Sequence, residues 1–272
     1  MDLRRPHVGI RAHHPRMGLR WFVRGAELVQ RQTLGLTACA LFYLLMHLPA
    51  MLPVVGMAIA TVLAPFATLG LMSACRESAQ GRTPTAQVYL DLFQHEHLRR
   101  KLFRLGIANA ILTLLMLMGM LLTGLGQTLP AQPTPDAPIE LDWTLLAAAL
   151  AFYLPVVIMM WFAPMLVGWH GVSVPKALFG SVVACWKNLA SMGVFTLIMA
   201  AVLVALGSVI GVLLTALGIG EQIGTLLIAP FALILLAVMQ AGIYVMYTDI
   251  IETITTPQTE GAPAPEEPPP NA

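Results

Sequence analysis

The sequence predicts an all-α integral membrane protein, a bundle of six transmembrane helices with interfacial amphipathic helices on the cytoplasmic side. Three observations lead to this fold class: the composition, the lengths of the apolar stretches and the placement of the basic residues. Of the 272 residues, 57% are hydrophobic and only 11% are charged, against about 45–50% and about 25% in soluble proteins. So few charges could not cover a soluble surface, which excludes a secreted, nucleic-acid-binding or disordered protein for most of the chain.

Six apolar stretches approach or exceed the roughly 20 residues that a helix needs to cross a hydrocarbon core about 30 Å thick. They are apolar on all faces and too long for the strands of a barrel, so we expect helices. The predicted spans are residues 33–51, 52–75, 102–125, 144–168, 189–217 and 223–247. Pro49 and Pro53 mark a tight reversal between the first two, and we expect the fifth to continue a helix that begins earlier.

The direction of the spans follows from the basic residues, because cytoplasmic loops carry an excess of Lys and Arg. All fifteen fall before the first span, between the second and the start of the third, or between the fourth and the fifth. The alternate connections carry only acids, namely Asp136, Glu140, Asp142 and Glu221. This pattern predicts a membrane protein with both termini in the cytoplasm.

Each odd-numbered span is preceded by an amphipathic segment of the kind that lies in a membrane interface. In the first segment, Arg20, Arg24, Glu27 and Arg31 share one face of a helix. We expect the second to begin at Thr83-Pro84 and the third at Pro175. The predicted apolar stripe of the second segment is Val88, Tyr89, Leu92 and Phe93. That of the third segment is Leu178, Phe179, Val182, Val183 and Trp186, and it lies opposite Lys187 and Asn188.

The chain therefore reads as three units of an interfacial helix followed by a transmembrane hairpin. Ala-Pro pairs at Ala64-Pro65, Ala163-Pro164 and Ala229-Pro230 fall in the even-numbered spans. They are consistent with an ancestral threefold repeat, and equally with coincidence in a chain rich in both residues. The predicted domain organisation is a disordered basic tail (1–17), the membrane domain (18–255) and a disordered acidic, proline-rich tail (256–272).

No motif for catalysis, phosphate binding or metal binding is found, so we expect no enzyme, no cofactor and no metal site. Cys39, Cys75 and Cys185 lie in or beside apolar segments, without the spacing of a zinc site or a disulfide framework. His95 and His97 are two apart, so on a helix they point in different directions.

Few polar side chains lie within the spans. Asn109, Gln240 and Tyr244 either form hydrogen bonds between helices or line a cavity. Gly207 and Gly211 form a GxxxG pattern, for which internal helix packing is the first interpretation and dimerisation the second.

Part of the pattern resembles a family of multi-pass inner-membrane proteins of proteobacteria of unknown function. The residues that carry this resemblance are Trp21, Gly25, Leu28, Gln32, Pro53-Val54-Val55-Gly56, Pro65, Gly70-Leu71, Ala74-Cys75-Arg76, Gly81 and Pro84. A looser similarity at Pro164 and residues 175–181 is to YciC-like proteins and to the membrane domains of some glycerophosphodiesterases. The resemblance implies six helices in a bacterial inner membrane and brings no activity.

Two functional hypotheses remain. In the first, the protein is non-enzymatic and its interfacial helices bind anionic phospholipid headgroups or a partner protein, including a second copy of the chain. The residues that would do so are Arg20, Arg24, Arg31, Arg99, Arg100, Lys101 and Arg104, although these charges could serve only to fix the topology. In the second, a permease or exporter of a small neutral or apolar solute has a central cavity lined by Asn109, Gln240 and Tyr244.

Overall fold

The computed structural model describes residues 7–123, 143–218 and 221–254, and most of these are helical. Six helical segments in this part of the chain are long and apolar enough to cross a membrane. The all-α membrane bundle predicted from composition and span length is confirmed. A short amphipathic helix precedes each odd-numbered span, so the structure contains three consecutive units of one helix and one hairpin.

In the first unit, a tight turn joins the two helices of the hairpin. Its elements are α1 (Met17–Arg31), α2 (Thr33–Leu45), the 3-10 helix η1 (Leu48–Met51) and α3 (Val55–Ala79). Val54 has a φ of 59°, a strained value for a β-branched residue. A Cβ added at Gly56 would lie 1.8 Å from the Pro49 carbonyl oxygen. The reversal predicted at Pro49 and Pro53 therefore depends on a glycine at position 56.

The second unit docks its short helix through a buried tyrosine. Its elements are α4 (Gln87–Gln94), α5 (Glu96–Leu122), α7 (Trp143–Trp161) and α8 (Ala163–His170). The Tyr89 hydroxyl donates to the Cys39 carbonyl oxygen at 2.8 Å, and its ring lies against Gly70, where a Cβ would approach it to 2.2 Å. Phe93 stacks on Phe66 with ring centroids 4.8 Å apart. The predicted apolar stripe of α4 thus packs on α2 and α3.

Two predicted boundaries in this unit were wrong. The helix α4 begins at Gln87, so Thr83 and Pro84 lie in the connection before it, where Pro84 packs against Gly35. The helix α5 begins at Glu96, six residues before the predicted start of the third span. Hydropathy marks where a helix enters the apolar layer, and Lys and Arg favour helix well enough to extend it beyond that layer.

The fourth span is interrupted at Phe162, between α7 and α8, and a serine of the third unit repairs the break. In a continuous helix the Phe162 N–H would donate to the Ile158 carbonyl. Here it donates to the Ser181 hydroxyl at 3.0 Å, which in turn donates to the Ile158 carbonyl at 2.6 Å. Pro164 opens α8 just beyond the break. Ser181 therefore supplies both missing partners in a buried place.

Replacing Ser181 with alanine is expected to lower the free energy of unfolding by about 1–3 kcal/mol, because a buried N–H and a buried carbonyl lose their partner. The shift in melting temperature of the protein purified in detergent measures this loss. Ser208→Ala is the matched control, since Ser208 is exposed on α10. Equal melting temperatures for the two variants would contradict this account of the break.

The third unit consists of α9 (Val174–Lys187), α10 (Leu189–Ala216) and α11 (Glu221–Ile250). The prediction that the fifth span continues an earlier helix was wrong, because α9 and α10 are separate and meet at Asn188. This residue is buried, and its side chain donates to the Ala184 carbonyl at 3.0 Å. An asparagine that bonds the backbone in this way competes with the helical ladder.

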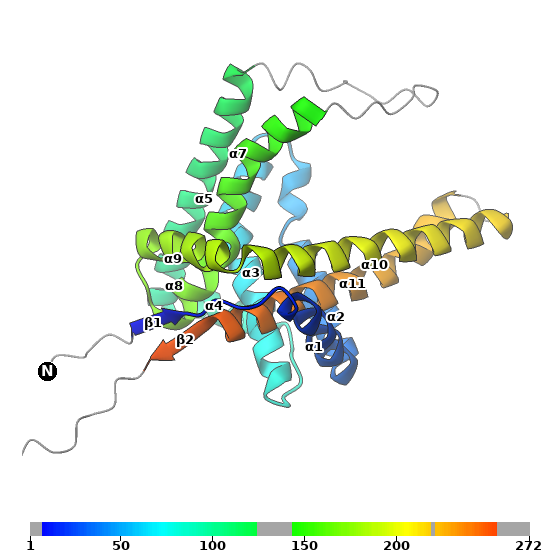
Figure 1. Ribbon diagram of the computed structural model, residues 1–272, viewed down its shortest axis with the longest axis horizontal. Coiled ribbons are helices and arrows are strands. Elements are labelled where there is room, and N and C mark those ends of the chain that lie inside the picture. The colour runs from blue at the N-terminus through cyan, green and yellow to red at the C-terminus, as the bar shows by residue number, and fades with distance from the viewer. Residues whose placement is uncertain (1–6, 124–142, 219–220, 255–272) are drawn as a thin grey trace, which may run out of the picture.

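The three hairpins share a common base and then diverge. Helix α3 contacts helices of all three units. The α5/α7 and α10/α11 hairpins leave the base in different directions (Figure 1). At the base, β1 (His7–Ile10) pairs with β2 (Ile251–Ile254) in an antiparallel sheet that joins the first and last described segments. The predicted disordered tail does not extend through residues 7–16, and residues 1–6 and 255–272 lie outside the described residues.

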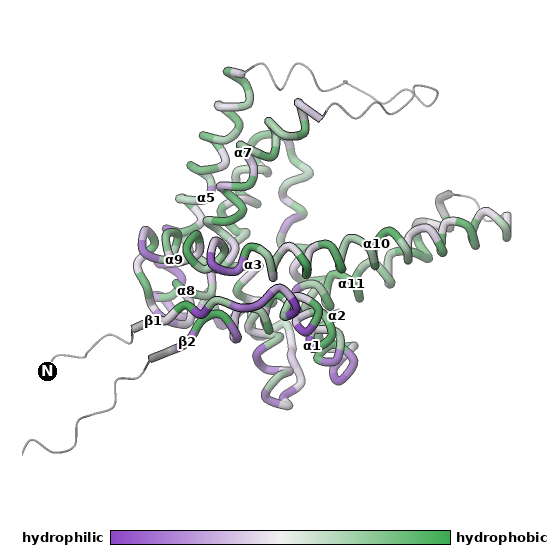
Figure 2. The backbone as a smooth tube through the Cα atoms, in the orientation of Figure 1, coloured by the Kyte–Doolittle hydropathy of each residue, from purple (hydrophilic) through white to green (hydrophobic). Residues whose placement is uncertain are grey.

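The surface of the protein divides sharply between apolar hairpins and a polar base. Hydrophilic residues gather on α1, on the segment before it and near the other short helices, whereas the outer parts of the hairpins are mostly apolar (Figure 2). Only 6% of the most apolar window of α10 is buried within the protein. Apolar surface on this scale needs a lipid environment. The basic residues of the described chain lie at the base, as their positions in the sequence predicted.

Candidate functional site

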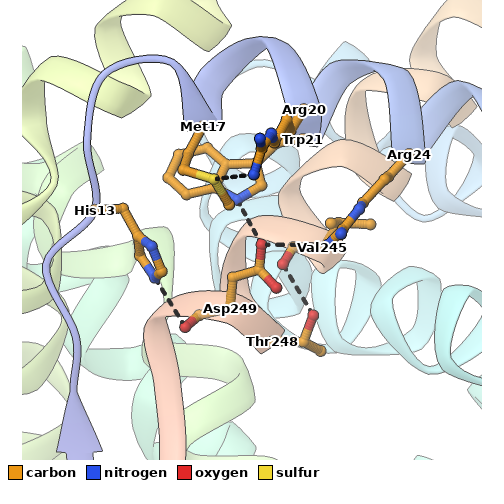
Figure 3. A network of polar contacts seen from close by, with 8 residues as sticks. All are labelled: His13, Met17, Arg20, Trp21, Arg24, Val245, Thr248 and Asp249. Atoms are coloured by element: carbon orange, nitrogen blue, oxygen red, sulfur yellow. Dashed lines mark hydrogen bonds and ion pairs between the residues drawn. The ribbon is translucent and has the colours of Figure 1, made fainter.

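Helix α1 is fixed to the end of α11 by contacts that converge on one carboxylate. The Trp21 indole N–H donates to Oδ2 of Asp249 at 2.9 Å, and the Arg24 guanidinium lies 3.8 Å from the same oxygen. The His13 ring contacts the backbone carbonyl of Asp249 at 3.0 Å. Figure 3 shows these side chains pointing toward the end of α11. Asp249 therefore joins α1 and the segment before it to the last span.

A second set of hydrogen bonds attaches the N-terminal segment to the start of α10. The buried Asn188 side chain accepts from the His13 backbone N–H at 2.9 Å and donates to the Arg11 carbonyl at 2.9 Å. The Ser191 hydroxyl donates to the His13 carbonyl at 3.0 Å. Arg11 also pairs with Glu252 at 2.6 Å. The segment before α1 thus bridges the first helices of the chain and its last unit.

Packing and charge divide α1 into two faces. Gly18, Trp21, Gly25 and Leu28 are buried against α10 and α11. The predicted charged face is exposed on the other side, at Arg20, Arg24, Glu27 and Arg31. Because Asp249 neutralises Arg24 in part, Arg20 and Arg31 are the residues of this face with no acidic partner in the described parts of the chain.

The second predicted basic cluster lies in the first turns of α5, which also extends into the membrane domain. Its members are Arg99, Arg100, Lys101 and Arg104. Lys101 Nζ donates to the Gly171 carbonyl at 2.9 Å and so caps α8, whereas Arg100 pairs with Glu96. Arg99 donates to a backbone carbonyl of α4 at 3.2 Å. Arg99 and Arg104 are exposed and have no acidic partner among the residues described.

The two aromatic residues of the apolar stripe predicted for α9 face away from the protein. Phe179 and Trp186 are 70% and 77% exposed, whereas the buried face consists of the small residues Ala177, Ser181, Ala184 and Cys185. Lipid is as apolar as a protein core, so large apolar side chains face it and small ones allow close helix contacts. Burial raises the pKa of the Cys185 thiol to about 12, so this cysteine is unreactive at neutral pH.

The polar residues predicted to line a central cavity do not meet in one place. The Asn109 amide donates to the Thr61 carbonyl at 3.0 Å, between α5 and α3. Gln240 is buried in α11, only 6% exposed. Tyr244 lines a pocket at the base of the bundle, and neither Asn109 nor Gln240 is among the lining residues of that pocket. Asn109 thus holds α5 and α3 together.

Comparison with known proteins gives one curated relative. The chain is 30% identical over 243 residues to a protein of Burkholderia thailandensis named probable inner membrane protein BTH_II0599, with 85% of this chain and 89% of the relative covered. The chain belongs to the same family. The predicted location in the inner membrane is therefore confirmed. No protein-family model matches the chain, and no solved structure matches it significantly.

In this inner membrane protein, the glycines that lie at close helix contacts are not Gly207 and Gly211 of the GxxxG pattern. A Cβ added at Gly207 or Gly211 would meet no heavy atom within 4 Å, so internal packing through this GxxxG pattern was a wrong prediction. A Cβ at Gly25 would lie 2.5 Å from the Gly242 nitrogen. A Cβ at Gly106 would lie 2.2 Å from the Val62 carbonyl oxygen. Dimerisation through Gly207 and Gly211 stays a prediction.

Sequence reasoning missed the residues that attach the N-terminal segment. His13 and Asn188 belong to units that are far apart in sequence, and nothing local marks them as partners. Asp249 carried a usable signal, since it is an acid at the end of an apolar span, where an unpaired carboxylate is costly. That position predicts a basic or hydrogen-bond-donating partner without identifying it as Trp21 and Arg24.

Proposed function

We propose that the protein is a non-enzymatic inner membrane protein whose interfacial helices bind anionic phospholipid headgroups at the cytoplasmic surface. The observation that carries this proposal is the division of α1, whose apolar face is locked to α10 and α11 while its arginines remain exposed. A helix fixed in this way holds its charges at the level of the headgroups. Each Lys or Arg near an anionic surface contributes about 1 kcal/mol.

The exposed aromatic residues of α9 support an interfacial position for the base. Phe179 and Trp186 project from the protein close in sequence to Lys176 and Lys187, all four being exposed. Aromatic side chains concentrate at the headgroup level because their rings tolerate both lipid and water. The exposed guanidinium groups of α1 and α5 lie at the same end of the hairpins, so anionic headgroups are their natural counterions.

We propose that the base faces the cytoplasm, because it carries the basic residues whereas the alternate connections carry acids. An impermeant maleimide should then label Asp136→Cys, in the connection between α5 and α7, from the periplasmic side of intact cells. Gln80→Cys, in the connection between α3 and α4, should react only after lysis. The buried native cysteines give a low background. The reverse labelling pattern would refute this orientation.

The lipid-binding proposal is tested by neutralising the four exposed arginines of α1 and α5 that have no acidic partner in the described segments, with glutamine at Arg20, Arg31, Arg99 and Arg104. At about 1 kcal/mol each, their loss is expected to weaken the binding of phosphatidylglycerol by roughly tenfold or more. Native mass spectrometry of the detergent-purified protein, titrated with this lipid, counts the bound molecules.

The matched control places lysine at the same four positions, which keeps the charge and is expected to retain binding. Phosphatidylcholine, with no net charge, should bind both variants alike. If the glutamine variant binds phosphatidylglycerol as well as the unchanged protein does, these arginines serve only the topology and the proposal fails.

A further inference from the structure

A pocket of about 370 Å³ lies at the base of the bundle, among the ends of three helices. Its lining includes Arg76 of α3, Trp169 and His170 of α8, and Tyr244, Tyr247 and Thr248 of α11. The volume is at the small end of the range for ligand sites, enough for a headgroup or a small anion. None of the four exposed arginines of the basic faces of α1 and α5 is among its lining residues.

No acidic side chain of the described residues pairs with the positive charge in this pocket. No acidic residue lines it, and Arg76 has no ion pair with any acid in the described segments. The Arg76 guanidinium lies over the Trp169 ring, 5.3 Å from its centroid. Stacking on an indole orients a guanidinium while leaving its N–H edge available for a planar or tetrahedral oxyanion.

A buried donor without a partner lies in the same wall. Tyr247 is only 3% exposed, and its hydroxyl has no hydrogen-bond partner within the part of the chain that the structure describes. Its ring is held edge-on to Trp169, with centroids 5.3 Å apart. Buried hydroxyls are almost always paired, so an acceptor from outside the chain would satisfy this group.

The C-terminal ends of α3, α8 and α11 also affect whether the pocket favours an anion or a cation. Each C-terminus carries about half a negative charge, which opposes an anion. Lys101 offsets that charge at α8 through its bond to the Gly171 carbonyl, and Arg76 brings a full positive charge. The negative charge of the helix ends therefore does not cancel the preference for an anion that Arg76 gives the pocket.

We propose that this pocket binds a phosphate-bearing anion, with the Arg76 guanidinium as its charge partner and the Tyr247 hydroxyl as a hydrogen-bond donor. The same chemistry is presented by a phospholipid headgroup at the membrane surface and by free phosphate. The four arginines on which the proposed function rests do not line this pocket, so the two proposals can be tested independently.

The test titrates the full-length protein in detergent, at constant ionic strength, with inorganic phosphate and with the short-chain lipid dihexanoyl-phosphatidylglycerol. Line broadening in phosphorus NMR reports binding of both probes. Arg76→Gln is expected to weaken binding by roughly tenfold or more, and Tyr247→Phe by roughly threefold to tenfold. Arg76→Lys keeps the charge and should fall between the unchanged protein and Arg76→Gln.

The matched control is Arg82→Gln, because Arg82 follows α3 in the chain but already pairs with Glu77. This variant and the variant with four glutamines are expected to bind as the unchanged protein does. Lipid bound more than tenfold tighter than phosphate identifies a headgroup as the source, and comparable affinities identify the free anion. Binding of neither probe, or equal binding by Arg76→Gln and Arg82→Gln, overturns the proposal.

Discussion

Replacing Trp21 with alanine is expected to lower the free energy of unfolding by about 3–5 kcal/mol, the usual loss for a large buried aromatic residue. The Trp21 side chain is completely buried, and its indole N–H is the shortest side-chain contact of Asp249, at 2.9 Å. Alanine would leave a large cavity between α1 and α11 and remove one of the two partners of a carboxylate. Chemical denaturation in mixed micelles measures the loss.

Two further variants separate packing from hydrogen bonding at this position. Trp21→Phe keeps most of the volume and removes the donor, so its expected loss is smaller, about 1–3 kcal/mol. Trp186→Ala is the control, because Trp186 is 77% exposed and should change the stability little. Release of α1 also exposes arginine bonds to trypsin, which gives a second readout. Equal stability of Trp21→Ala and Trp186→Ala would refute the role of Trp21.

Placing valine at Gly25 is expected to separate α1 from α11. A Cβ at this position would lie 2.5 Å from the nitrogen and 2.7 Å from the Cα of Gly242. Both atoms belong to the backbone of α11, so no change of rotamer relieves the overlap. Overpacking in a core costs about 1–3 kcal/mol where side chains can adjust, and we expect a loss at or above this range. Melting temperature and trypsin cleavage within α1 report it.

The reciprocal position gives a graded comparison. A Cβ at Gly242 would meet the Phe195 ring at 2.5 Å, and a side chain can move where a backbone cannot. Gly242→Ala is therefore expected to be milder than Gly25→Val. Gly207→Val is the control in a helix with open space around the glycine. If Gly25→Val melts as Gly207→Val does, the close crossing of α1 and α11 is not what holds α1 in place.

The membrane spans could be predicted from the sequence because the bilayer imposes a length and an apolar composition. The fifth span, predicted as 189–217, matches α10 (Leu189–Ala216) closely, since a polar residue bounds the apolar run at one end and a positive-φ glycine, Gly218, follows at the other. The amphipathic helices before the odd-numbered spans also followed from periodicity. The basic faces of α1 and α5 were identified for the same reason.

The contacts between units could not be predicted, because they join residues with no local relationship. Ser181 has no pattern that would connect it to the break at Phe162. In α9 the periodicity gave the apolar stripe, but it did not show that the small residues of the helix make the protein contacts while Phe179 and Trp186 stay exposed. Around Arg76, the lining residues come from three helices and from β2, and only their folding together places Tyr247 beside Trp169.

The packing of α1 on α11 also determines the order in which the protein can mature. Trp21 and Asp249 are 228 positions apart, so the ribosome produces the first partner long before the second. Until the sixth span has entered the bilayer, the part of the α1 face at Trp21 and Gly25, which packs on α11, has no protein surface to cover it. A nascent chain that stops before α11 thus exposes this face, and complete synthesis is a condition for closing the base of the molecule.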